Sequence, residues 1–341
     1  MQLLDVKWPL IQAPMAGAQG IELAIAVATA GALGSLPCAM LNAAQIQQAV
    51  TQFRQRVNAP INLNFFCHKS PATQPQQLQQ WQQQLQPYYQ ELSATSVHNV
   101  AERRPFDAAM AEAIAPLRPE VVSFHFGLPA LSLLQQVKSW GGKVIASATT
   151  VAEGLWLQAQ GVDAVIAQGL EAGGHRGHFL NDDLSLQLGI FALLPQLVAA
   201  LNVPVIAAGG MVDATTIAAA MKLGAAGVQV GTAYLLCPEA TISQLHRQAL
   251  ADSQRNPHTA LTRVFSGRPA RGIVNRLMQE QADAAIPDFP LAANAIAPLR
   301  RAAEQQGNSD FSPLWCGQNA SGCRAIPAEA LTRQLVSGFQ R

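Results

Sequence analysis

The sequence predicts a TIM-type (β/α)8 barrel, and two observations support this prediction. Short apolar stretches bounded by Gly or Pro alternate with longer stretches rich in Ala, Leu and Gln. This alternation is typical of β/α units built around a parallel sheet. Eight strand candidates occur before about residue 232, a number that fits a closed barrel better than an open sheet.

The strand candidates are largely continuous apolar runs, as expected for strands that are buried on both faces. They cover Leu10–Pro14, Ala32–Leu36, Ile61–Phe65, Val121–Phe124, Val144–Ala148, Ala164–Gln168, Val205–Ala208 and Val228–Val230. Helix candidates follow most strands, at Ile21–Ala30, Ala43–Arg56, Ala130–Trp140, Val151–Gln160, Leu186–Leu201 and Thr215–Leu223. The last of these helices follows Asp213, a favoured capping residue, and ends at Gly224.

A helical insertion is expected after the third strand, at residues 68–105. Its Gln-rich part has apolar or aromatic residues at helical spacing, namely Leu78, Trp81, Leu85 and Tyr88. This spacing favours an amphipathic helix over a disordered glutamine tract.

The chain beyond the barrel core, which we expect at about residues 8–240, forms a C-terminal extension. Residues 241–341 are Ala-rich and mainly helical in pattern, with breaks at Pro287, Pro290 and Pro298. We expect this extension to cover the barrel mouth within a single domain of residues 1–341. A separate second domain is the alternative, although no linker-like composition marks a boundary.

Composition and charge exclude several classes of partner. The formal net charge is +1 and the charges are mixed along the chain, so nothing provides the basic face that nucleic acid or an anionic membrane requires. No apolar run reaches the roughly 20 residues that span a bilayer, and the N-terminal segment lacks the pattern of a signal peptide. The five cysteines include no CxxC pair, so no metal site is predicted, and a reducing cytoplasm fits best. Both a monomer and a homodimer remain open.

Two consecutive strand ends predict a phosphate site. In β/α barrels, phosphate commonly binds to the loops after strands seven and eight. These loops begin with AAGG, at Ala207–Gly210, and VQVGT, at Val228–Thr232. Glycine allows close approach of the backbone, and exposed amides at a helix start favour an anion. Gly209, Gly210, Gly231 and Thr232 are the candidates, the alternative being that the glycines serve tight turns.

The end of strand six carries the principal catalytic candidate, His175, within the segment EAGGHRG. Glycines on both sides would let the backbone pass close to a planar ligand while the imidazole faces the cavity. Histidine titrates near neutral pH and acts as a base, a hydrogen-bond donor or an electrostatic partner.

Three further polar residues end strands at the predicted barrel mouth. His125 is a candidate substrate contact, although Phe124 and Phe126 on either side leave a packed core histidine as the alternative. The amides of Asn64 and Gln168 could hydrogen-bond the edge of a heterocycle, and Asn64 could instead cap a turn.

Motifs of other enzyme classes are absent from the sequence. It contains no GxSxG elbow, no HExxH, no Walker loop and no GxGxxG after a strand. A phosphate site with polar amides and one histidine favours an enzyme whose cofactor supplies the electron chemistry.

The chain resembles the nitronate monooxygenases, formerly called 2-nitropropane dioxygenases, which are FMN-dependent β/α barrels. The resemblance rests on QAPMAG at 12–17, NLNFF at 62–66, SFHFG at 123–127, AQGLEAGGHRG at 167–177, AAGGM at 207–211, VQVGTAYL at 228–235 and SGRPARG at 266–272. It implies that His175 is the active-site histidine. It also implies FMN contacts at Asn64, Gln168, Gly173, Gly210, Gln229, Val230, Gly231 and Thr232.

Within this superfamily the segments AQG, HRG and HFG are similar to those of the bacterial class I enzymes. That similarity implies oxidation of alkyl nitronates, notably propionate 3-nitronate, by molecular oxygen to a carbonyl compound plus nitrite or nitrate, as a detoxification. The alternative is an NAD(P)H-dependent flavin reductase acting on enoyl-acyl-carrier-protein or quinone substrates, because such enzymes share EAGGH and the phosphate loops. The tyrosines and the lysine associated with the family's substrate site have no counterpart here, since neither residue type occurs after Tyr234.

Overall fold

The computed structural model describes residues 2–72, 74–95, 103–251 and 257–340. Eight parallel strands form a nearly closed barrel in the order β1-β9-β8-β6-β5-β4-β3-β2, which confirms the predicted TIM-type architecture. Backbone hydrogen bonds between Gln12 and Leu33 and between Leu33 and Leu10 join the first and last strands of this order. All eight predicted strands are present, with ends that differ by at most two residues. They are β1 (Leu10–Gln12), β2 (Gly34–Pro37), β3 (Ile61–Phe66), β4 (Val121–His125), β5 (Lys143–Ala148), β6 (Ala164–Gln168), β8 (Val205–Ala208) and β9 (Gly227–Val230).

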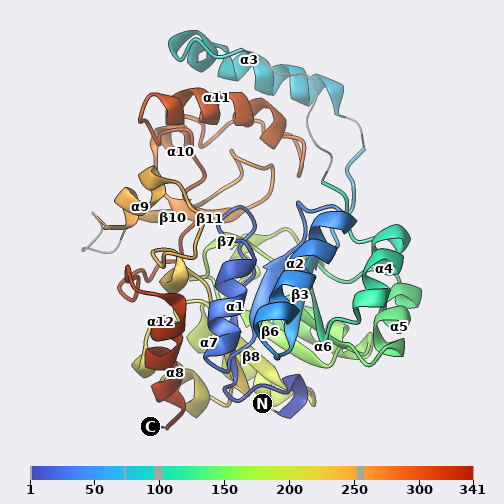
Figure 1. The fold of residues 1–341 in the computed structure, drawn as a ribbon. Coiled ribbons are helices and arrows are strands. Elements are labelled where there is room, and N and C mark those ends of the chain that lie inside the picture. The colour runs from blue at the N-terminus through green and yellow to red at the C-terminus, as the bar shows by residue number, and fades with distance from the viewer. Residues whose placement is uncertain (1, 73, 96–102, 252–256, 341) are drawn as a thin grey trace.

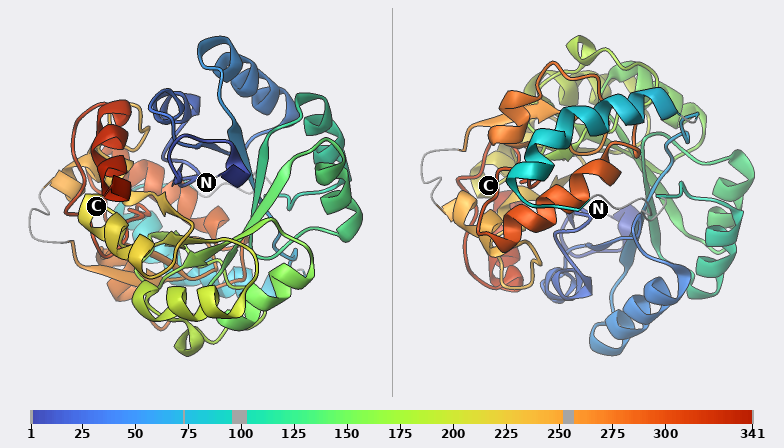
Figure 2. Two further views of the ribbon diagram at one scale, coloured as in Figure 1. Left: turned by 90° about the horizontal axis from the view of Figure 1, so that it is seen from below. Right: turned by 90° about the horizontal axis from the view of Figure 1, so that it is seen from above.

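The helices form a ring around the sheet (Figure 2). They are α1 (Ile21–Thr29), α2 (Ala43–Arg56), α4 (Ala108–Ile114), α5 (Leu131–Ser139), α6 (Val151–Ala159), α7 (Ile190–Ala200), α8 (Ala214–Lys222) and α12 (Ala328–Leu335). One expected helix, Leu186–Leu201, is shorter, because three residues separate α7 from the 3-10 turn Leu184–Leu186. No described helix is both long and apolar enough to cross a membrane.

The eighth barrel helix is α12, close to the C-terminus. It packs against α1 and α8 (Figure 1). The buried hydroxyl of Tyr234 contacts that of Thr332 at 2.8 Å. The expectation that the barrel core ends near residue 240 and that all of 241–341 covers the mouth is therefore wrong for this last segment. The outer wall between α1 and α8 is apolar, and Leu331 and Leu335 cover it.

The barrel mouth is covered by two insertions that pack on each other. One lies between β3 and α4 and contains α3 (Pro75–Glu91), so the predicted amphipathic helix is confirmed; the expected segment 68–105 also includes residues 73 and 96–102, which lie outside the described residues. The other runs from β9 to α12 and contains α9 (Gln244–Ala251), α10 (Arg276–Glu280) and α11 (Ala293–Gln305). Helix α3 lies over α11 (Figure 1). Their apolar faces contribute to a second core that includes Trp81, Leu85, Tyr88, Leu277, Ile296, Leu299 and Phe311.

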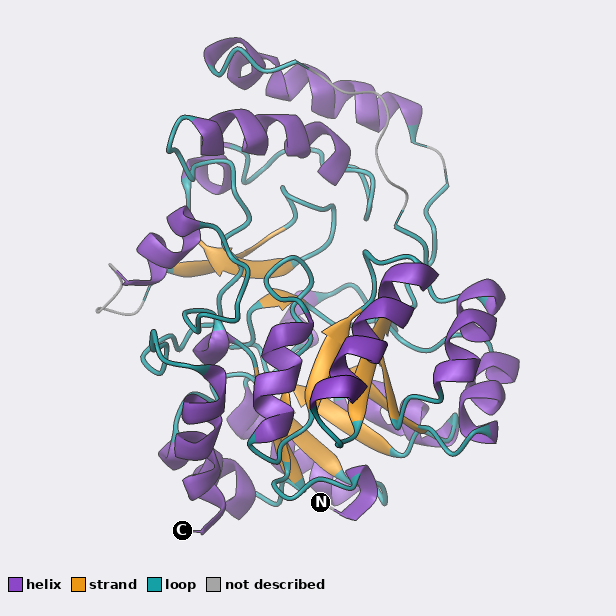
Figure 3. Ribbon diagram, viewed as in Figure 1, coloured by secondary structure: helices purple, strands orange, loops and turns teal. Residues whose placement is uncertain are grey.

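A small antiparallel sheet, absent from our sequence analysis, joins the barrel to this cover. It has the order β10-β11-β7, with β7 (Gly174–His175), β10 (Thr259–Thr262) and β11 (Ala270–Ile273). His175 is paired with Ala270, and Gly174 with Arg271. The sheet lies between the barrel and α11 (Figure 3), so that the loop carrying His175 is tied to the second insertion.

The inner face of the barrel changes from apolar to polar along its strands. Deep in the barrel, Val121, Ile145 and Ile166 pack with Leu4 of the N-terminal 3-10 helix (Gln2–Leu4). Two residues further along the same strands, and hence on the same face, are Ser123, Ser147 and Gln168. The polar end of the interior is the carboxyl end of the strands, where β/α barrels place their sites.

Candidate active site

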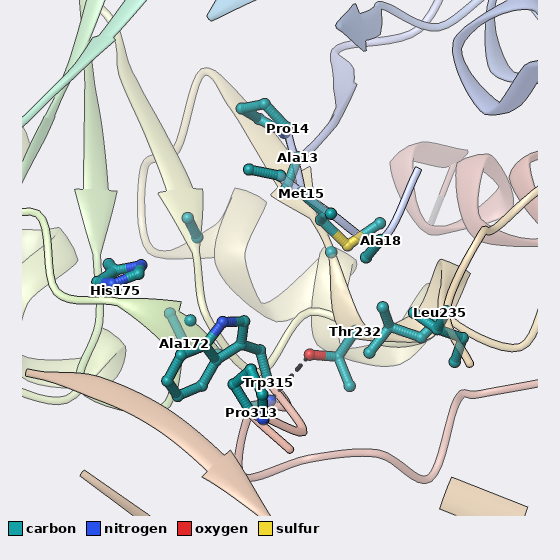
Figure 4. Close-up of a pocket in the computed structure, with 18 of the residues that line it drawn as sticks. Ala13, Pro14, Met15, Ala18, Ala172, His175, Thr232, Leu235, Pro313 and Trp315 are labelled. Carbon is teal, nitrogen blue, oxygen red and sulfur yellow. Dashed lines mark hydrogen bonds between the residues drawn. The ribbon is translucent and has the colours of Figure 1, made fainter. Parts of the chain in front are cut away.

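A cavity of about 420 Å³ opens at the carboxyl ends of the strands, a size suited to a cofactor or small substrate. His175 lies on one side of it and the loop with Ala13, Pro14 and Met15 on the other, while Trp315 reaches in from the second insertion (Figure 4). The predicted site residues that line the cavity are His175, His125, Asn64, Gln168, Gly173, Gly210, Gln229, Gly231 and Thr232. The side chain of Val230 does not line the cavity. Successive side chains of a strand point to opposite faces, and that of Val230 points into the main hydrophobic core.

Free backbone amides gather at the ends of β8 and β9. Within the part of the chain that the structure describes, the N–H groups of Gly209, Gly210, Gly231 and Thr232 donate no hydrogen bond, although all four residues line the cavity. Gly210 has φ +73°, and a Cβ added there would meet no atom within 4 Å. This open, donor-rich backbone is suited to binding an anion.

The amide side chains of Asn64 and Gln229 each offer an acceptor to the cavity. Asn64 donates to the backbone carbonyl and the hydroxyl of Ser123, at 3.2 and 2.9 Å, and its oxygen accepts no hydrogen bond from the described residues. The side-chain oxygen of Gln229 is buried and has no partner there either. A buried polar atom without a partner is costly, so a ligand that donates to these oxygens would be stabilised.

The His175 imidazole is enclosed by aromatic rings from the barrel and from the second insertion. Its Nε2 atom lies 2.8 Å from the hydroxyl of Ser266. The ring centroids of Phe289 and Trp315 are each 5.5 Å from that of His175, and Phe66 and Phe126 lie slightly further away. The second insertion thus supplies three residues around the catalytic candidate, of which Phe289 had no sequence signal.

Burial holds both candidate histidines in their neutral forms. Burial, reinforced by the charge of Arg103, lowers the pKa of His175 well below its usual 6.5. The pKa of His125 is lowered to about 3, again mainly by burial. Near neutral pH, His175 is therefore neutral and is able to hydrogen-bond or to accept a proton.

Gln168 and His125 hold the backbone of the His175 loop. The Nε2 atoms of both side chains donate to the carbonyl of His175, and Oε1 of Gln168 accepts from the N–H of Gly177 at 2.7 Å. Because Nε2 of His125 carries the proton, its Nδ1 accepts from the Ser147 hydroxyl at 3.1 Å. In this structure both residues position His175, a role that the sequence did not indicate.

Two charged residues of the EAGGHRG segment also support the loop. Arg176 is fully buried and donates to the carbonyls of Gln168 and Gly169 and to the side chain of Gln187. The carboxylate of Glu171 accepts from the N–H of Ile190 at the start of α7. Gly173 has no room for a side chain, because a Cβ there would approach the N–H of Gly317 to 2.5 Å.

Arg103, from the first insertion, also lines the cavity, and nothing in its sequence context marks it as a site residue. No cluster of His, Cys, Asp or Glu suited to a metal ion occurs among the described residues.

Comparisons with known proteins agree with this geometry. The family model described as nitronate monooxygenase matches residues 1–338. The chain is 38% identical to the nitronate monooxygenase of Pseudomonas aeruginosa, covering 98% of this chain and 97% of that protein. It is also 38% identical to the enzyme of the same name from Paraburkholderia phytofirmans, over 98% and 93% of the two chains.

Two solved structures share the fold. A nitroalkane oxidase from Streptomyces ansochromogenes superposes with a TM-score of 0.90 at 33% identity, covering 98% of this chain and 96% of that one. FabK from Thermotoga maritima has a TM-score of 0.73 at 24% identity, over 99% and 94% of the two chains, which shows a common fold only.

Proposed function

Because the chain belongs to the nitronate monooxygenase family, a family of flavoenzymes, we propose that it oxidises alkyl nitronates with FMN as cofactor and molecular oxygen as electron acceptor. Propionate 3-nitronate is the proposed substrate, the products are a carbonyl compound and nitrite or nitrate, and detoxification is the proposed role. The observation that supports this most directly is a family match over nearly the whole chain that coincides with a cavity lined by His175.

The cavity has groups that fit each part of FMN. The free amides of Gly209, Gly210, Gly231 and Thr232 would hold the phosphate, and the unpartnered oxygens of Asn64 and Gln229 would accept from the ring N–H and the ribityl hydroxyls of FMN. Gln168 fits less directly, since the loop already uses both of its amide atoms. When bound, the flavin supplies the electron transfer from nitronate to oxygen.

The proposed task of His175 follows from its neutral state. A nitronate has already lost its carbon proton, so the enzyme has to orient and stabilise an anion and has no proton to remove. A neutral imidazole with one N–H provides such a donor, and the rings of Phe66, Phe126, Phe289 and Trp315 exclude water from it. Towards a neutral nitroalkane, His175 would instead act as the base.

The first test is the purified protein's visible absorbance spectrum, followed by oxygen consumption with propionate 3-nitronate. We expect a flavin spectrum, rapid uptake of oxygen, and a loss of turnover of about 100-fold or more in His175→Asn with flavin still bound. His258→Asn, a change at an exposed histidine outside the cavity, is the matched control.

Anaerobic mixing with NADPH or NADH separates the proposal from a flavin reductase. We expect the flavin absorbance to persist. Rapid bleaching by a nicotinamide, with no oxygen uptake on any nitronate, would instead assign the chain to reductase chemistry.

A further inference from the structure

Arg103 is a cavity-lining cation without a counter-ion. No hydrogen bond or ion pair engages its guanidinium within the described residues, whereas Arg176, Arg268 and Arg271 donate to carbonyl groups. Burial lowers its pKa from the usual 12.5, and no carboxylate offsets that effect. A cation that is removed from water and has no counter-ion is unfavourable, and an anionic ligand that pairs with it would offset this cost.

The fold holds Arg103 at the mouth through its backbone. Its carbonyl accepts from Nε2 of His68 at 3.1 Å, and three residues later the N–H of Phe106 donates to the carbonyl of Phe66, at the end of β3. The guanidinium lies 5.8 Å from the ring centroid of Phe289, which is also a neighbour of His175. Arg103 and His175 are therefore both neighbours of the Phe289 ring, and both line the same cavity.

The carboxylates that line the cavity are engaged elsewhere. Glu171 accepts from the N–H of Ile190, and Glu304 pairs with Arg300 at 2.7 Å while accepting from the Ser312 hydroxyl. The positive charge of Arg300 is therefore paired with the carboxylate of Glu304 on the same helix. Among the described cavity residues this leaves Arg103 as the free positive charge.

Arg103 is anchored away from the proposed phosphate cradle, which consists of the free amides of Gly209, Gly210, Gly231 and Thr232. The cradle lies at the ends of β8 and β9, whereas Arg103 is anchored at the end of β3, which β1 and β2 separate from β9 around the barrel. An anion held by Arg103 would thus be distinct from a phosphate at Gly210.

We propose that Arg103 determines substrate specificity by binding a carboxylate at the far end of a nitronate whose reacting end lies beside His175. This inference rests on the proposed function for the reacting end, but the recognition of a carboxylate can be measured without turnover. A guanidinium matches a carboxylate with two parallel N–H donors, which gives orientation as well as affinity.

The test is isothermal titration of the flavin-loaded protein with succinate, which resembles propionate 3-nitronate in charge and length but is not a nitronate. We expect wild type to bind succinate, and Arg103→Met to raise the dissociation constant about 10- to 100-fold. Arg103→Lys should fall between them, because it keeps the charge without the planar pair of donors. Arg104→Met, which alters the adjacent arginine outside the cavity, should bind like wild type.

Steady-state kinetics on two nitronates then tests specificity. Arg103→Met should lower kcat/KM about 10- to 100-fold for propionate 3-nitronate and less than threefold for the nitronate of 1-nitropropane, which has no carboxylate. Equal losses on both nitronates, or unchanged succinate binding in Arg103→Met, would overturn the proposal. If wild type oxidises neither nitronate but succinate binding still depends on Arg103, the function fails while the anion site stands.

Discussion

His125 donates from Nε2 to the backbone carbonyl of His175 over 3.2 Å, so that one candidate histidine fixes the main chain of the other. The same carbonyl also accepts from Gln168. Side chains of β4 and β6 therefore both hydrogen-bond the loop that carries His175. Burial lowers the pKa of His125 to about 3, so the ring is neutral and its Nδ1 accepts a hydrogen bond from the Ser147 hydroxyl.

Replacing His125 with Leu removes both of these hydrogen bonds at similar side-chain volume. We expect kcat on propionate 3-nitronate to fall about tenfold or more, because small shifts of a catalytic group cost large factors in rate. The free energy of unfolding should fall by about 1–3 kcal/mol, since a buried acceptor loses a partner. Oxygen uptake and urea denaturation measure the two effects.

Ser147→Ala is the control for this change, since it removes only the hydroxyl that donates to Nδ1. It should retain most of kcat, because the bond to His175 survives. If Ser147→Ala and His125→Leu lose the same activity, bracing of the loop is not the role of His125.

The buried histidines predict instability in mild acid. Burial lowers the pKa of His68 and His246 to about 4 and that of His125 to about 3, against 6.5 for the unfolded chain. Between these values and 6.5 the unfolded chain binds more protons, so stability is fully present above about pH 6.5 and is lost as the pH falls towards 4. Each histidine contributes at most about 1.4 kcal/mol per pH unit in this window.

Urea denaturation at pH 7.5, 6.0 and 5.0 measures this loss. His246→Gln cannot titrate, so its free energy of unfolding should depend less steeply on pH than that of wild type. A wild-type stability that is constant from pH 7.5 to 5.0 would contradict the neutral, buried state of these residues.

Gly210 allows the proposed phosphate cradle to be tested against a matched position. Gly210 and Gly307 have φ values of +73° and +74°, and a Cβ at either position would meet no atom within 4 Å. Alanine at each site should therefore cost a similar backbone strain of about 1–2 kcal/mol. Only Gly210 lines the cavity, so only Gly210→Ala should weaken FMN binding.

Flavin content after purification, and fluorescence titration of the apoprotein with FMN, give the result. We expect Gly210→Ala to bind FMN at least tenfold more weakly than Gly307→Ala. Equal affinities would place the phosphate elsewhere in the cavity.

The barrel could be predicted from the sequence because strands that are buried on both faces are short continuous apolar runs, which can be recognised without knowledge of distant contacts. Stretches such as Ala164–Ala167 and Val205–Ala208 are apolar throughout, since one face of each strand packs against helices and the other faces the barrel interior. The glycines at their ends are equally local signals. These local features identify residues that, with the exception of the Val230 side chain, line one cavity.

The cover could not be predicted in the same way, because its contacts are long-range. β7 is two residues long and pairs with β11, almost 100 positions later. Arg103 and Phe289 meet beside His175 only because the two insertions pack together. The helix that closes the barrel ring, α12, follows an insertion that runs from residue 231 to residue 327, so in the sequence it is far from the barrel units and was not predicted as a barrel helix.

Arg176 illustrates a residue whose motif suggests chemistry but whose contacts indicate support. Its guanidinium is buried, donates to Gln168, Gly169 and Gln187, and has a pKa that burial lowers to about 10, so it stays charged at neutral pH. Arg176→Met would leave three acceptors without their donor, at a cost of about 3 kcal/mol or more in the free energy of unfolding. Arg176→Lys should recover only part of this loss, because an ammonium group cannot reproduce the planar geometry. Arg333→Met, at an exposed pair with Glu329, should change stability by less than about 0.5 kcal/mol, and an equally small effect at Arg176 would refute its supporting role.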